Sequence, residues 1–245
     1  PGAHAQSSQG ALRGTVKDAQ SVIPGVAVTL VNEATNVSRD TVTNEVGEYS
    51  FPAVEPAVYT VKVALAGFKT FQREGVRVNT QQQVALDVML EVGAIEETIT
   101  VTGDAPLIDT ASASTGGVVD ETTLQSIPTA GRSVFLMATL EPTVQTSENS
   151  KWNRMQDQQG NSGISMGGGP VRSNNFLVEG FPVTDLLNRA STNPSMEAVG
   201  EMKVQVHTYD AEMGRTGGGV MNMTAKSGSN QWRGSAYTVV RPSSW

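Results

Sequence analysis

The sequence predicts a mainly β protein with two folded units, a β-sandwich followed by a second unit of mixed α and β structure. Up to residue 90, short runs of alternating apolar and polar residues are separated by turn residues, which is typical of a sandwich. Beyond residue 111, short helical patterns ended by proline lie between strand-like runs, which favours a mixed sheet. With Gly 25, Pro 11 and 5% aromatic residues, the composition indicates short strands and turns rather than long helices.

The strands of the first unit follow from this alternation. Val26, Val28 and Leu30, for example, fall on one face of a strand. Pro24-Gly25 and residues 44–47 carry the residues that tight turns prefer. The expected strands cover residues 12–16, 26–31, 48–51, 59–65, 71–78 and 83–90.

The second unit combines short helices with strands. An acidic first turn at Glu121 and the breaker Pro128 delimit one helix, and Pro142 ends another. We expect helices at 121–127, 131–140 and 195–200, a strand and turn within 174–185, and strands at 201–206 and 220–225.

A glycine cluster stands at the centre of residues 209–237. Gly217, Gly218 and Gly219 leave backbone without side chains, which fits a tight turn or direct packing against another backbone. The residues alone predict a hairpin here, with a polar turn at 226–230 and a second strand at 231–240.

Composition excludes several classes of protein. A formal charge of -7 and a pI near 4.9 argue against a nucleic-acid partner. No apolar run approaches the roughly 18 residues of a membrane-spanning helix. The absence of cysteine rules out disulfides and thiolate metal sites.

The beginning of the chain indicates export. Ala3-His4-Ala5 is similar to the cleavage site of a signal peptide, so we expect an exported bacterial protein.

The chain also lacks the residue patterns of catalysis. His4 and His207 are its only histidines, and neither has a Glu partner at metal-ligand spacing. The serines have no histidine base, and Gly217–Gly219 is not followed by the Lys-Ser/Thr of a phosphate loop. We therefore expect no enzyme activity, no cofactor and no metal.

The first unit resembles the carboxypeptidase-regulatory-like, or transthyretin-like, family. The segments GTVKD, PGVAVTLVN, TNEVGEYSFPAVEPAVYTVKVALAGF and VALDVML occur in the order of that family. The resemblance implies a structural β-sandwich that occurs beside many different activities.

The second unit resembles the plug domain of TonB-dependent outer-membrane receptors that carry an extra immunoglobulin-like domain in front. The run EMGRTGGGVMNMTAKSGSNQWRGS is similar to the end of the plug and the first barrel strand, and IPTAGR is similar to a second family motif, with Ala130 replacing its usual asparagine. Glu179 stands where the family has Asp. Arg132 is expected to hold neighbouring loop carbonyls or a carboxylate of the barrel wall, or to be exposed and solvated. The plug-motif residues are Gly131, Arg132, Gly214, Arg215, Gly217, Gly218 and Gly219.

Between the two units lies a polar, β-prone strand with Ile99 and Val101 on one face. It resembles the TonB box, the segment that recruits the energy-coupling partner, and strand addition is the binding mode that such a segment supports. The alternative is an interdomain strand that packs on the plug. The box-like residues are Glu97, Thr98, Ile99, Thr100, Val101, Thr102 and Gly103.

The resemblance implies a function and a location. We expect the plug to gate substrate uptake through an outer-membrane β-barrel that is not in this chain, with a TonB-like energy-coupling protein as partner, at the periplasmic face of the outer membrane. The expected division is an N-terminal arm at 1–9, the sandwich at 10–91, a linker at 92–110, the plug at 111–230 and a barrel-like strand at 231–245.

A second hypothesis treats the chain as a barrel-less subunit of an extracellular filament. An unpaired terminal strand that adds to the sheet of a neighbouring copy gives an open assembly. The donor strand would be residues 11–17 or 232–241. In the second case the positions on one face are Trp232, Gly234, Ala236, Thr238 and Val240.

Overall fold

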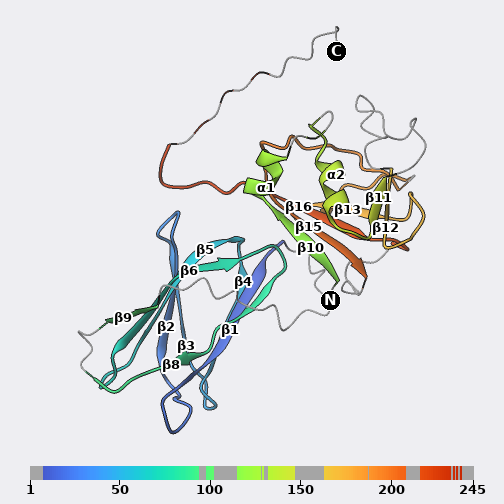
Figure 1. Cartoon of the computed structure of the whole chain (residues 1–245). Helices are drawn as coiled ribbons and strands as arrows, with labels where there is room; N and C mark the ends of the chain where they lie inside the picture. The colour runs from blue at the N-terminus through green and yellow to red at the C-terminus, as the bar shows by residue number, and fades with distance from the viewer. Residues whose placement is uncertain are drawn as a thin grey trace.

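The computed structural model describes part of the 245-residue chain, which folds into two units (Figure 1). Each unit has its own hydrophobic core. The sandwich unit comprises residues 8–93 together with the backbone of 98–101, and the C-terminal unit comprises described residues from 115 to 232. The described residues are 8–93, 98–101, 115–127, 129, 132–146, 163–186, 188–207, 216–232, 234, 236 and 238.

Two sheets form the sandwich unit, and they confirm the predicted β-sandwich. One sheet has the order β4-β1-β7, with β8 also paired to β1, and the other has the order β3-β2-β5-β6-β9. The strands are β1 (Gly10–Lys17), β2 (Ala27–Asn32), β3 (Ser38–Val42), β4 (Glu48–Val54), β5 (Ala57–Ala64), β6 (Thr70–Val78), β7 (Gln83–Ala85), β8 (Val88–Met89) and β9 (Thr98–Val101).

The alternation of the sequence places the apolar side chains between these sheets. Leu12, Val28 and Val61 are completely buried, as every second residue of a half-buried strand should be. The predicted strand at 83–90 is divided into β7 and β8, because the Asp87 carboxylate accepts the Thr15 N–H at 2.9 Å and replaces a backbone partner there.

The C-terminal unit is built on a sheet of order β10-β15-β16-β13-β14, with a separate pair β11-β12. Neighbouring strands are antiparallel except for β13 and β16, which are parallel. The elements are β10 (Thr115–Asp120), α1 (Glu121–Ser126), α2 (Val134–Met137), the 3-10 helix η2 (Ala138–Leu140), β11 (Val144–Thr146), β12 (Ile164–Met166), β13 (Asn175–Val178), β14 (Phe181–Pro182), β15 (Val199–His207) and β16 (Val220–Ala225).

The helices are short, and their bounds have local causes. Helix α1 begins after Asp120, whose carboxylate accepts the Thr123 N–H at 2.9 Å, and it confirms the helix predicted at 121–127. The helix predicted at 131–140 is shorter in the structure, because Ser133 is extended and α2 starts only at Val134. The helix predicted at 195–200 is wrong: residues 196–198 form a turn, and Val199 already pairs in β15.

The helices join the sheet through one apolar core. Phe135 of α2 and Phe176 of β13 are both completely buried, and their rings meet edge to face with centroids 5.2 Å apart. Leu124 of α1 and Met202 of β15 belong to the same buried cluster. No helix in the described part of the chain is long and apolar enough to cross a membrane.

Gly14 tests the packing of β1 inside the sandwich unit. A Cβ atom at Gly14 would overlap the Leu86 carbonyl oxygen, which is backbone and cannot move aside cheaply. We expect Gly14→Ala to lower the free energy of unfolding by about 2–4 kcal/mol. Urea denaturation measures this, with Gly228→Ala as the matched control because no atom lies within 4 Å of a Cβ there. Equal stability of the two variants would contradict the packing of β1 described above.

Candidate partner-binding segments and the contact between the units

The box-like segment lies on the sandwich unit. Residues Thr98–Val101 form β9, which pairs in parallel with β6, so that Thr70 lies opposite Thr98 and Arg73 opposite Val101. The pairing partner is therefore a strand of the sandwich and not of the C-terminal unit, contrary to the alternative interpretation that the strand packs on the plug. Glu97, Thr102 and Gly103 lie outside the described residues.

The glycine cluster packs backbone against backbone, as its sequence predicted. The N–H groups of Gly217 and Gly218 both donate to the Ser173 carbonyl at 3.0 Å. A Cβ at Gly218 would overlap Asn174 Oδ1, whereas a Cβ at Gly217 has only an ordinary contact with Ser173. A Cβ at Gly219 would lie 2.8 Å from the Gln205 carbonyl oxygen. Gly218 and Gly219 are thus required, because other segments of the same chain approach them too closely for a Cβ atom.

Asn174 supports this glycine loop, and the sequence did not single it out. Its side chain is buried, with 1% exposed, and it donates to the Ile164 carbonyl at 2.6 Å while accepting the Gly219 N–H at 3.1 Å. The signal was present as an asparagine directly before an apolar strand, but asparagine is common in exposed turns as well. Gly131, Gly214 and Arg215 of the predicted plug motif lie outside the described residues.

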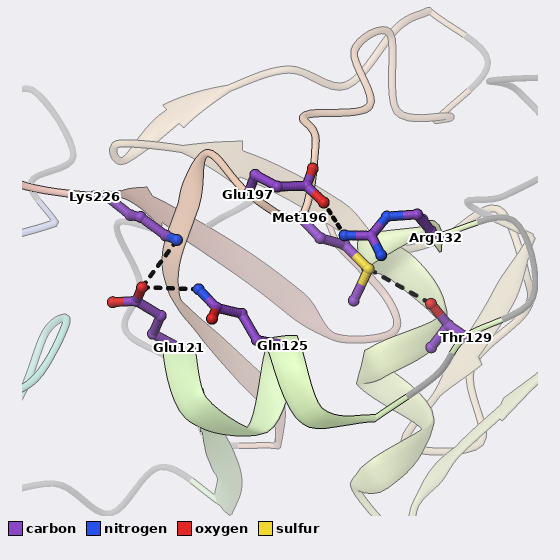
Figure 2. Close-up of polar contacts among 7 residues, drawn as sticks. All are labelled: Glu121, Gln125, Thr129, Arg132, Met196, Glu197 and Lys226. Atoms are coloured by element: carbon purple, nitrogen blue, oxygen red, sulfur yellow. Dashed lines mark hydrogen bonds and ion pairs between the residues drawn. The ribbon is translucent and has the colours of Figure 1, made fainter. Parts of the chain in front are cut away.

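Arg132 forms an ion pair with Glu197, as Figure 2 shows. Its described partner is therefore a carboxylate of the same unit, which differs from the barrel-wall carboxylate that the resemblance implied. The Arg132 backbone lies in the left-handed region, with φ of 53°. Residues other than glycine rarely adopt this backbone conformation. The same view shows Glu121 accepting hydrogen bonds from Lys226 and Gln125, both at 2.9 Å.

Glu179 retains a close carboxylate contact although the family pattern has aspartate. Glu179 and Gly180 form the two-residue turn between β13 and β14, and both have positive φ, 54° and 79°. The Glu179 carboxylate accepts the Ala225 N–H at 2.6 Å and the Ser8 hydroxyl at 3.1 Å. The longer side chain thus binds the end of β16 and the beginning of the sandwich unit.

A contact between the two units was not predicted from the sequence. We call it the latch: the loop of residues 79–82 between β6 and β7, bound to Glu201, Lys203 and Thr224. The Thr80 N–H donates to Glu201 Oε1 at 2.6 Å, and the hydroxyls of Thr80 and Thr224 share a hydrogen bond of 2.7 Å. Lys203, with only 7% exposed, donates from Nζ to the Gln81 carbonyl at 2.9 Å.

A further contact joins the units at Asn230, which lines a cleft together with Glu201 and Thr224 of the latch. The Asn230 side chain donates to the Thr35 carbonyl at 2.6 Å, and its backbone N–H donates to the Ala34 carbonyl at 3.2 Å. The cleft has a volume of about 1130 Å³ and is lined largely by polar and charged side chains, including Arg77 and Lys226. The described residues contain no group of three or more side chains placed to hold a metal ion.

The structure places the two segments that were predicted as filament donor strands in different ways. Residues 11–17 are excluded as a free donor, because β1 is paired with β4 on one side and with β7 and β8 on the other. Trp232, Gly234, Ala236 and Thr238 are not in a strand of the structure, and Trp232 is fully exposed. Val240 lies outside the described residues, so the C-terminal donor stays a prediction.

Comparison with known proteins shows what this chain is similar to. Residues 11–91 match the family model of the carboxypeptidase regulatory-like domain. Over nearly its whole length the chain is also similar to a TonB-dependent transporter, in agreement with the resemblance of its motifs. Over 98% of its length it is 29% identical to the TonB-dependent transporter Oar of Myxococcus xanthus. The chain covers 22% of that relative.

Solved structures resemble only parts of the chain. A type II cohesin–X-dockerin complex from Acetivibrio cellulolyticus is 18% identical, covering 34% of this chain and 58% of that chain with a TM-score of 0.29. A catechol 1,2-dioxygenase from Acinetobacter is 14% identical, covering 41% of this chain and 60% of that chain with a TM-score of 0.29. At such TM-scores neither likeness carries a functional argument.

The glycine loop gives a prediction with a built-in control. Gly219→Ala places a methyl group against the Met166 side chain and the Gln205 carbonyl, so we expect it to lower the free energy of unfolding by about 2 kcal/mol or more. Gly217→Ala has room for its methyl group and should change stability by less than about 0.5 kcal/mol. Thermal and urea unfolding of both variants measure the difference, and equal effects would contradict the packing of the loop.

Glu201 gives a prediction about pH. Burial raises the pKa of this carboxyl above its usual value of 4.5, although Thr80, Lys203 and Arg77 favour the charged form. The folded protein therefore binds the proton more tightly than the unfolded chain, and stability falls as pH rises from 4.5 through the raised pKa. We expect Glu201→Gln to lack this decline.

Urea unfolding of the unsubstituted chain and of Glu201→Gln across pH 4 to 7 measures this decline. The stability of the unsubstituted chain relative to the variant should decrease with rising pH. A constant or increasing difference would mean that hydrogen bonding and neighbouring cations outweigh burial at this carboxyl.

Proposed function

We propose that this chain is the periplasmic sandwich and plug region of a TonB-dependent outer-membrane receptor. The observation that carries the proposal is the similarity to the transporter Oar, which runs through 98% of the chain and so includes the sandwich unit, the box-like strand and the C-terminal unit. The function is gating of transport and not catalysis. The receptor acts in the outer membrane, with these residues at its periplasmic face.

In this proposal the C-terminal unit is the plug that closes a barrel. Its five-stranded sheet holds an apolar core, and the glycine loop before β16 is packed too closely to rearrange one residue at a time. Opening therefore requires work on the unit as a whole or on its connection to the rest of the chain. An energy-coupling protein supplies that work by pulling on an extended segment that it has bound.

The box-like residues Glu97–Gly103 are the segment that the coupling protein binds. Strand addition needs backbone N–H and C=O groups in an extended conformation, and Thr98–Val101 are already extended in β9. In the sequence they also lie between β8 of the sandwich unit and β10 of the C-terminal unit. Tension applied here reaches both units through the chain.

The experiment uses the full-length receptor and the periplasmic domain of the TonB-type protein from the same organism. We expect Ile99→Pro to weaken binding of that domain at least tenfold and to abolish energised uptake, because proline removes a backbone donor from the added strand. Substrate binding to the receptor should be unchanged.

Ile99→Ala is the matched control, since it shortens the side chain but keeps the N–H group. It should bind the coupling domain far better than Ile99→Pro. Unchanged affinity and uptake in Ile99→Pro would refute the assignment of the box. A receptor that never binds the coupling domain, with or without substrate, would refute the proposed function itself.

A further inference from the structure

The sandwich unit has a built-in docking edge for the box-like strand. Strand β6 pairs with β5 on one side, and on the other side its residues Thr70–Arg73 pair with β9. Strand addition is also the way in which a coupling protein would take up this segment. The same short stretch of backbone is therefore already engaged by its own chain.

A defined crossover delivers β9 to this edge. The Lys69 N–H donates to the Glu91 carbonyl at 2.8 Å, and the side chains of Lys69 and Glu91 form an ion pair of 3.7 Å. Val92 and Phe68 form an isolated antiparallel β-bridge, and the Gly93 N–H donates to the Gly67 carbonyl at 3.2 Å. The chain is thus fixed beside the beginning of β6 before it enters β9.

The tether after this crossover is short. Only residues 94–97 separate Gly93 from Thr98, the first residue of β9. A segment held by so short a tether meets its acceptor at a high effective concentration, on the order of millimolar. An external partner must compete with this internal one.

The described pairing of β9 with β6 covers four residues, from Thr70 to Arg73. Further along β6, the Gly75 N–H donates to Glu33 Oε1 at 2.9 Å, so a side chain of the sandwich unit takes the place of a strand there. The strand then continues into the loop 79–82 of the latch. The backbone hydrogen bonds of this pairing are ones that an added strand of a partner could replace.

We propose that the β6 edge sequesters the box-like strand, so that the sandwich unit regulates access of the coupling protein to it. This inference rests on the proposed function. The partner binds the fraction of molecules in which β9 has left β6, and its apparent dissociation constant rises as that fraction falls. The interaction surface is the β6 edge at Thr70–Arg73, and its competing occupant is a strand of the coupling protein.

The test locks β9 onto β6 in the full-length receptor. The chain contains no cysteine, so Gln72→Cys with Thr100→Cys introduces its only thiols, at positions that are paired in register. Paired residues on neighbouring strands bring Cα atoms within the span of a disulfide. The matched control is Thr29→Cys with Lys62→Cys, which joins β2 to β5 in the same sheet and leaves β9 untouched.

We expect the oxidised lock to bind the periplasmic coupling domain at least tenfold more weakly than the reduced lock, and the control pair to bind equally in both states. Unchanged binding by the oxidised lock would overturn the inference, because the partner would then be adding to the outer edge of β9. Absence of binding by the unsubstituted receptor would instead overturn the proposed function, and with it the inference.

Hydrogen exchange provides a measurement that does not need the coupling protein. The amides of Thr98–Val101 should be protected in the unsubstituted receptor, and an insertion of about ten Gly and Ser residues after Gly93 should reduce the effective concentration of β9 about sixfold. The insertion should lower that protection and strengthen binding of the coupling domain by up to the same factor. Amides that exchange as fast as those of an unfolded peptide would overturn the pairing.

Discussion

Strand β6 is the element on which the arrangement of the chain depends, because it pairs with the box-like strand at its beginning and leads at its end into the loop that is bound to the C-terminal unit. At its beginning, Thr70–Arg73 pair with β9. At its end, it runs into the loop whose Thr80 N–H donates to the Glu201 carboxylate at 2.6 Å. Hydrogen-bonded neighbours in a sheet move together, so a displacement of β6 is felt both by the box-like strand and by the C-terminal unit.

The sequence predicts those parts of the fold that have local causes. Alternation brings Leu12, Val28 and Val61 into the sandwich core, and it does so strand by strand without reference to the rest of the chain. Asp120 supplies the cap of α1 from a neighbouring position. The resemblance of the motifs then adds the class of protein, which composition and periodicity do not contain.

The contacts that join distant segments were not predictable in the same way. Lys203 and Gln81 are 122 residues apart, and no local pattern links a lysine in a strand to a carbonyl in a distant loop. The pairing of β9 with β6 was not predictable either, because a largely polar strand has no strongly apolar face that would select its partner and register. The glycine cluster predicted close packing, but only the positions of Asn174 and Gln205 show that Gly218 and Gly219 are the residues that need it.

The chemistry of the latch differs from that of the cores on either side of it. Each core is apolar, whereas the latch consists of Glu201, Lys203 and two threonine hydroxyls bound to a loop. Opening a polar contact returns its groups to water, which offsets much of the hydrogen bonding that is lost, whereas opening a core exposes apolar surface without compensation. Under the proposed function, a pull on the segment between the units should separate them at the latch before it unfolds either core, so that energy applied at β9 would act first on the relative position of the sandwich and the C-terminal unit.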